Sequence, residues 1–182
     1  MTASDPKRTV KISLRIGGTE GLSMSKSLRI REALPQEANL LSCLALRSKA
    51  HWGYSEDFLE ACRSELTVDA SRLGSDDYQC FAALDGDSIV GFYTLESTSS
   101  GSYELEALFV EPEHIGDGVG RLLIQHAVRR LSEHGVGRLI IQGDPHATEF
   151  YLAAGARQVG TRESGSIPGR ELPLFEIEIA NT

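Results

Sequence analysis

The sequence predicts an α/β fold: a single mixed, mostly antiparallel central sheet flanked by helices. Three observations support this prediction. Strand-like and helix-like patterns alternate along a chain of 182 residues, a length that suits one domain with a sizeable core. Asp85-Gly86 divides two strand-like runs, as in an antiparallel hairpin. By contrast, the short apolar run at 138–143 is typical of a buried, parallel strand.

The first half of the chain alternates short apolar patterns with polar loops. Pro35 can open a helix because an N–H at that position would have no partner, and Ser55 is a suitable N-cap for the next helix. The spacing of apolar residues predicts strands at 10–16 and 28–34, helices at 35–50 and 55–64, and a hairpin at 78–96. We expect residues 1–27 to form an N-terminal extension with an extra strand, and residues 28–182 to form the compact domain.

The second half continues the alternation. Asp144-Pro145 opens the last helix, with Asp as N-cap and Pro at the first position, and Gly155 ends it. The predicted elements are a strand at 103–110, a helix that ends near His134, the strand at 138–143, a helix at 144–155, and strands at 156–163 and 171–179.

Charge and cysteine content narrow the classes of partner. A formal net charge of −8 disfavours binding to nucleic acid or to anionic membranes and is compatible with an amine substrate. Cys43, Cys62 and Cys80 are widely spaced, so the sequence predicts neither a disulfide framework nor a metal site, and a reducing cytoplasm is the simplest location. No apolar run reaches membrane-spanning length.

Three glycines at alternate positions, Gly116, Gly118 and Gly120, come just before an apolar helix pattern. They favour an anion site, because the first N–H groups of a helix lack partners and glycine leaves them accessible. A tight strand-to-helix turn is the alternative. Arg121 stands where the dinucleotide-binding fingerprint needs glycine, and no Lys-Ser or Lys-Thr follows, as the nucleotide-binding loop requires.

Residues 105–156, LEALFVEPEHIGDGVGRLLIQHAVRRLSEHGVGRLIIQGDPHATEFYLAAGA, resemble the GNAT superfamily of acyl-CoA-dependent N-acetyltransferases. The strand, the glycine loop, the helix, the next strand and a helix containing tyrosine occur in that family's order and spacing. The family's loop pattern is Gln/Arg-x-x-Gly-x-Gly/Ala. Ile115 departs from its Gln/Arg position, and Asp117 places a negative side chain where the family often has a basic one.

The resemblance implies that acetyl-CoA is the co-substrate. Backbone N–H groups of the glycine loop would hold the pyrophosphate of coenzyme A, and the end of the preceding strand would hold its pantetheine arm. The cofactor-binding residues implied in this way are Leu108, Phe109, Val110, Gly116, Asp117, Gly118, Val119, Gly120 and Arg121.

Acetyl transfer to an amine needs a neutral amine and an acid for the departing thiolate. Tyr151 matches the family's recurrent tyrosine and is the predicted acid, since a phenol with a pKa of roughly 10 is protonated at neutral pH; packing or ordering the cofactor is its alternative role. Glu104 and Glu106 are the candidates for base or proton relay, with a route through water alone as the alternative. Strand alternation puts both on one face with Leu108 and Val110, unless a bulge intervenes.

The stretch KAHWGYS at 49–55 links the two early helices, where the family places part of its acceptor site. We expect Trp52 and Tyr54 to form an aromatic wall for the acceptor; a helix corner plugged by aromatic side chains is the alternative. The segment at 164–177 would supply the opposite wall, with Arg170 as a contact for an acidic group.

The sequence thus predicts an enzyme that transfers an acetyl group from acetyl-CoA to a primary amine of a small molecule or to an exposed protein amine. One alternative is a regulatory module that binds an acyl-CoA with little or no turnover. Another is a different nucleotide- or phosphate-binding α/β protein. The acceptor, the acyl chain and the oligomeric state, with a homodimer as one option, are left open.

Overall fold

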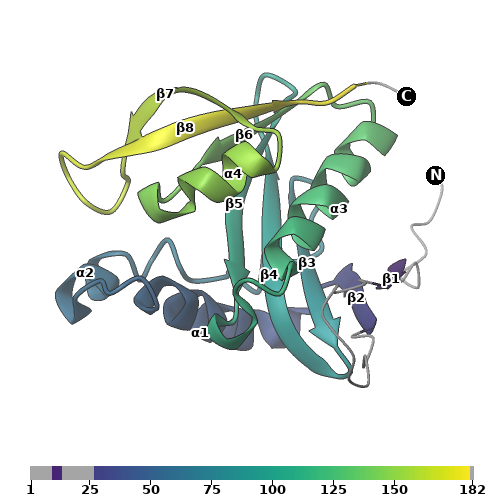
Figure 1. Cartoon of the computed structure of the whole chain (residues 1–182), viewed down its shortest axis with the longest axis horizontal. Coiled ribbons are helices and arrows are strands. Elements are labelled where there is room, and N and C mark those ends of the chain that lie inside the picture. The colour runs from purple at the N-terminus through teal and green to yellow at the C-terminus, as the bar shows by residue number, and fades with distance from the viewer. Residues whose placement is uncertain (1–9, 14–26, 181–182) are drawn as a thin grey trace, which may run out of the picture.

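The computed structural model describes residues 10–13 and 27–180. Its strands form one eight-stranded sheet in the order β1-β2-β3-β4-β5-β6-β8-β7 (Figure 1). Neighbouring strands are antiparallel except β5 and β6, which are parallel, so the predicted fold class is confirmed. The strands are β1 (Val10–Ser13), β2 (Ser27–Glu32), β3 (Tyr78–Asp85), β4 (Ser88–Ser97), β5 (Tyr103–Val110), β6 (Arg138–Gln142), β7 (Arg157–Glu163) and β8 (Glu171–Glu178).

Helices cover both faces of the sheet. On one face, Leu41 and Leu44 of α1 share a buried cluster with Phe92 of β4. On the other face, Leu123 of α3 and Tyr151 of α4 share a cluster with strand residues such as Leu105 of β5. None of the helices in the described part of the chain is long and apolar enough to cross a membrane. The helices are α1 (Ala38–Ala50), α2 (Glu56–Ala61), α3 (Val119–Glu133) and α4 (Thr148–Ala153).

The extra strand of the N-terminal extension belongs to the main sheet. β1 pairs with β2 in an antiparallel register, with Val10 opposite Ile30. β1 therefore lies at one edge of the sheet and β7 at the other. Residues 14–16 of the predicted strand, and residues 1–9 and 17–26 of the extension, lie outside the described residues.

The helix starts follow the predicted caps, with small differences. The Ser55 hydroxyl accepts the N–H of Phe58, and the Asp144 carboxylate accepts the N–H of His146. Short 3₁₀ turns at 35–37 and 145–147 precede α1 and α4, as is common at helix N-termini. α2 ends at Ala61, earlier than predicted, because the chain then turns to bury Cys62 and Leu66 beside α1.

Candidate active site

β5 and β6 separate part of the way along β5. Their parallel pairing joins Tyr103–Leu105 to Leu139–Ile141. Beyond Leu105, β4 is the one described strand that pairs with β5, whereas β6 continues beside β8. No described strand occupies the β6-facing edge of β5 at 106–110, so backbone N–H and C=O groups on that edge can bind a ligand. We call this space the β5–β6 opening, and the predicted pantetheine-binding residues lie along it.

A β-bulge in β5 changes which side chains share a face. Thr94 of β4 lies opposite Ala107 and Leu95 lies opposite Leu105, so Glu106 is the extra residue. Leu105 and Val110 pack in the same cluster. In a regular strand they would lie on opposite faces, because their positions differ by an odd number. The face expected to carry Glu104, Glu106, Leu108 and Val110 together in an unbulged strand is therefore not formed.

The two predicted carboxylates have different surroundings. Glu104 forms an ion pair with Arg162 of β7, and only 17% of its side chain is exposed. Glu106 is exposed, and within the described residues its carboxylate makes no hydrogen bond or ion pair. Partial desolvation and then the nearby Glu104 and Glu96 carboxylates raise the pKa of Glu106. Glu106 is thus the better placed of the two to accept and release a proton.

At the start of α3, the glycine loop has amides with no backbone partner among the described residues. Gly116 and Gly118 have φ values of +92° and +84°, which side-chain-bearing residues rarely adopt, and Gly118 is the N-cap of α3. The first amide paired within the helix is that of Leu122, which donates to the Gly118 carbonyl at 3.0 Å. The preceding N–H groups of 118–121 donate to no backbone carbonyl of the described residues and lie at the positive end of the helix dipole.

The other residues around the glycine loop differ in their surroundings. Val119 is buried, and Arg121 is exposed. A Cβ on Gly120 would lie 3.2 Å from the Phe150 ring, so this glycine lets α4 approach α3. The Asp117 carboxylate lies 3.4 Å from Nδ1 of His114.

Tyr151 lies in α4 beside the end of β6. Its ring packs against Phe150 and Phe175, with centroids 5.0 and 5.4 Å away. The residue is 6% exposed, and its hydroxyl makes no hydrogen bond to the described residues. Burial, reinforced by the Asp144 carboxylate, raises the pKa of Tyr151. The phenol is therefore protonated at neutral pH, as a proton donor must be.

Tyr54 joins a polar cluster that the sequence did not predict. Its hydroxyl donates to the Asp144 carboxylate at 2.9 Å and accepts from Nη2 of Arg170 at 2.9 Å. Lys49 of α1 donates to Asp144 at 2.6 Å. We call Lys49, Tyr54, Asp144 and Arg170 the Asp144 cluster. It joins the α1–α2 connection to the chain beyond β6 and to the β7–β8 connection.

Trp52 lies beside this cluster at the surface. Its ring stacks on His146, with centroids 5.4 Å apart and planes 7° apart, and its exposed fraction is 40%. Tyr54 packs against Phe58 of α2 at 4.3 Å. The two predicted wall residues are thus brought together near the end of β6, and Trp52 is too exposed to act as a core plug.

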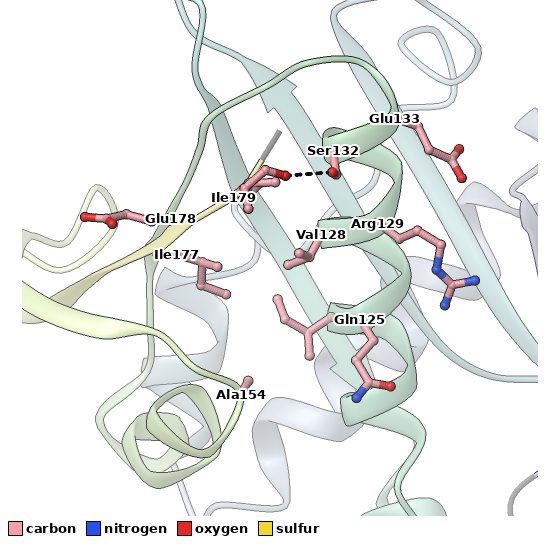
Figure 2. Close-up of a pocket in the computed structure, with 11 residues that line it drawn as sticks. Gln125, Val128, Arg129, Ser132, Glu133, Ala154, Ile177, Glu178 and Ile179 are labelled. Carbon is pink, nitrogen blue, oxygen red and sulfur yellow. Dashed lines mark hydrogen bonds between the residues drawn. The ribbon is translucent and has the colours of Figure 1, made fainter. Parts of the chain in front are cut away.

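A separate groove lies away from these residues. Figure 2 shows Gln125, Val128 and Arg129 of α3 on one side and Ile177 and Glu178 of β8 on the other. Its volume is about 790 Å³. It is lined by the second half of α3, whereas the glycine loop precedes that helix, and no predicted site residue lines it.

Asp144, Lys49 and Gly143 are the site residues that sequence reasoning missed. Asp144 was expected only to cap a helix. A usable signal was its position directly after a buried parallel strand, where ligand-binding groups of α/β sheets gather. Gly143 carries no comparable signal, since its role depends on two rings that arrive from α4 and β8.

Replacing Gly143 with alanine should lower the free energy of unfolding by about 1–3 kcal/mol. An added Cβ would lie 2.9 Å from ring atoms of both Tyr151 and Phe175, which are buried and cannot retreat easily. Chemical denaturation measures the effect. Gly137→Ala is the matched control, because a Cβ there meets nothing within 4 Å. Equal stability of the two variants would contradict the close packing.

Comparisons with known proteins agree with this geometry. A model of the GNAT acetyltransferase domain matches residues 43–165. The peptidyl-lysine N-acetyltransferases YjaB of Escherichia coli (strain K12) and Salmonella typhimurium are 30% and 28% identical, over 82% of this chain and 95% and 97% of theirs. The structure of the PaiA N-acetyltransferase of Thermoplasma acidophilum with coenzyme A aligns at 20% identity and a TM-score of 0.67, over 84% of this chain and 99% of that one.

The chain belongs to the GNAT family of acetyltransferases, since the family model covers more than half of it. Within that family, it is an N-acetyltransferase.

Proposed function

We propose that this enzyme transfers the acetyl group of acetyl-CoA to the side-chain amine of an exposed protein lysine. The observation that carries the proposal is the β5–β6 opening. The α3 amides beyond the end of β5 have no backbone partner among the described residues, Glu106 lies at the bulge of β5, and the Tyr151 ring lies against Gly143 just beyond β6. The named activity of the YjaB relatives supports lysine as the acceptor.

The residues of the opening fit acetyl-CoA. Outward amides and glycines without side chains suit a pyrophosphate, and Arg121 adds a positive charge next to them. The free edge of β5 at 108–110 offers backbone groups to the pantetheine amides. Bound acetyl-CoA would supply the thioester carbonyl that the amine attacks.

The chain's own residues would move two protons. The Glu106 carboxylate accepts a proton from the lysine ammonium, directly or through water, and leaves a neutral amine. As the new C–N bond forms and the C–S bond breaks, the Tyr151 hydroxyl donates its proton to the departing thiolate. The second proton of the amine leaves the new amide nitrogen through water and returns the Tyr151 phenolate to its protonated form. Trp52 and Tyr54 form a wall that holds the acceptor beside the opening, and positioning of this kind supplies much of the rate.

Replacing Gly118 with valine should weaken acetyl-CoA binding at least about tenfold, or about 1.4 kcal/mol. The branched side chain would stand where the pyrophosphate must approach, at a residue with a φ of +84°. Titration calorimetry with acetyl-CoA measures the affinity, and thiol release with a lysine peptide measures turnover.

Gly101→Val is the matched control for that variant. Gly101 has a φ of +78° in the loop between β4 and β5, so valine there carries a similar backbone strain far from the glycine loop. Unchanged affinity in a folded Gly118→Val protein would remove the loop from the cofactor site. Tight acetyl-CoA binding without thiol release for any amine would favour the acyl-CoA-binding module instead.

A further inference from the structure

Arg170 is a positive group with a weakly engaged guanidinium. Its only hydrogen bond to the described residues goes to the neutral Tyr54 hydroxyl, and the Asp144 carboxylate is 3.7 Å away. By comparison, Arg31 makes two hydrogen bonds to Glu37, at 2.7 and 2.8 Å. An arginine fork presents five N–H donors, so most of those of Arg170 lack an acceptor in the part of the chain that the structure describes.

The charge of Asp144 is already balanced by another residue. Lys49 donates to it at 2.6 Å, with only 15% of the lysine side chain exposed. This lysine, together with nearby hydrogen bonds, outweighs burial and lowers the pKa of Asp144, so the carboxylate is ionised. Two cations against one anion leave the Asp144 cluster with a net charge of +1, in a chain whose formal net charge is −8.

The fold holds Arg170 firmly and leaves it partly open. The Arg170 carbonyl accepts the Ser164 N–H at 2.7 Å, and its own N–H donates to Ile167 at 3.1 Å, within the β7–β8 connection. The guanidinium lies 4.8 Å from the Phe58 ring centroid, and 20% of the side chain is exposed. A preorganised, half-desolvated guanidinium is well suited to bind a carboxylate through two hydrogen bonds.

The Asp144 cluster lies on the β6 side of the β5–β6 opening. Asp144 is three residues beyond Ile141, where the pairing of β6 with β5 ends. Glu106, on the β5 side, is one residue beyond Leu105, where the same pairing ends. An acceptor whose amine reaches Glu106 would therefore have the Asp144 cluster on the other, β6 side of the opening. Figure 1 shows the β7–β8 connection and α2 on the same side of the molecule, which the Arg170–Phe58 contact confirms.

We propose that Arg170 binds a carboxylate carried by the acceptor, so that the preferred acceptor is a lysine flanked by an acidic side chain. This specificity rests on the proposed lysine acetyltransferase function. The general field of an acidic protein would repel such a peptide, so a preference for it requires a local positive site.

The test compares two peptides, acetyl-Gly-Glu-Lys-Glu-Gly-amide and its Gln-Lys-Gln counterpart. Each is titrated calorimetrically into the full chain saturated with coenzyme A, and each is assayed for thiol release with acetyl-CoA. The acidic peptide should bind about tenfold more tightly, as one charge-assisted contact predicts. A second pair, Nα-acetyl-lysine and its amide, tests whether a free α-carboxylate replaces the acidic side chain.

The ratio of the two peptide affinities should fall to about one in Arg170→Gln and be partly retained in Arg170→Lys, which keeps the charge without the fork. Arg157→Gln is the control: Arg157 lies on the same hairpin, 68% exposed, and its loss should leave the ratio unchanged. Equal binding of the peptides to the unaltered chain, which needs no variant, would overturn the proposal, as would a ratio that survives Arg170→Gln.

Failure of the proposed function has a different signature. If no acceptor yields thiol release while the acidic peptide still binds more tightly through Arg170, the proposed carboxylate site is supported and the proposed lysine acetyltransferase function is wrong. If both peptides are acetylated with equal kcat/KM and bind equally, the proposed lysine acetyltransferase function is supported and the proposed carboxylate site at Arg170 is wrong.

Discussion

Replacing Tyr151 with phenylalanine should lower kcat by about 10²-fold, or about 2.7 kcal/mol of transition-state stabilisation. The change keeps the ring that packs against Phe150 and Phe175 and removes only the hydroxyl, which has no partner among the described residues. The affinity for acetyl-CoA should stay within a few-fold, because the lost group acts on the departing sulfur. Steady-state kinetics with a lysine peptide and calorimetry with acetyl-CoA measure the two quantities.

Tyr103→Phe is a suitable control for the loss of a phenol. Tyr103 is also partly buried against the α3–α4 side of the core, but it lies at the start of β5, where β5 and β6 are still paired. This variant should keep kcat within a few-fold of the unaltered enzyme. A Tyr151→Phe enzyme with near-normal kcat would show that Tyr151 only packs.

The fold was largely predictable because its signals are local. The Asp85-Gly86 turn, the apolar run at 138–143 and the caps at Ser55 and Asp144 each act over a few residues, and the structure has each of them. The glycine loop was predictable as a unit. The reason for each glycine was not predictable. Gly116 and Gly118 have positive φ values, whereas Gly120 leaves room for Phe150 of α4.

The parts of the site that escaped prediction depend on contacts between distant segments. The bulge at Glu106 exists only in relation to β4, and no residue type in YELEALFV marks it. The Asp144 cluster joins Lys49 to groups more than ninety positions away in the chain. A single sequence gives the chemistry of such residues but not the partner that orients them.

Glu106→Gln should lower kcat/KM for a lysine peptide by about 10²-fold and remove the acidic limb of the pH profile. The raised pKa of Glu106 determines where that limb lies in the unaltered enzyme. A base must be deprotonated, so activity should fall as the pH decreases through a value above the ordinary pKa of glutamate. The amide cannot titrate, so the variant should show only the increase that comes from deprotonation of the lysine itself. Initial rates between about pH 4.5 and 9 measure both effects.

Glu104→Gln is the matched comparison, because it removes a carboxylate two residues away that is already paired with Arg162. It should cost less than about tenfold and keep the acidic limb, moved to lower pH, since the Glu104 charge is one cause of the raised pKa of Glu106. The opposite ranking of the two variants would make Glu104 the base. If neither variant changed the limb or the rate, proton removal would proceed through water alone, and the bulge would serve only to open the edge of β5 to the pantetheine arm.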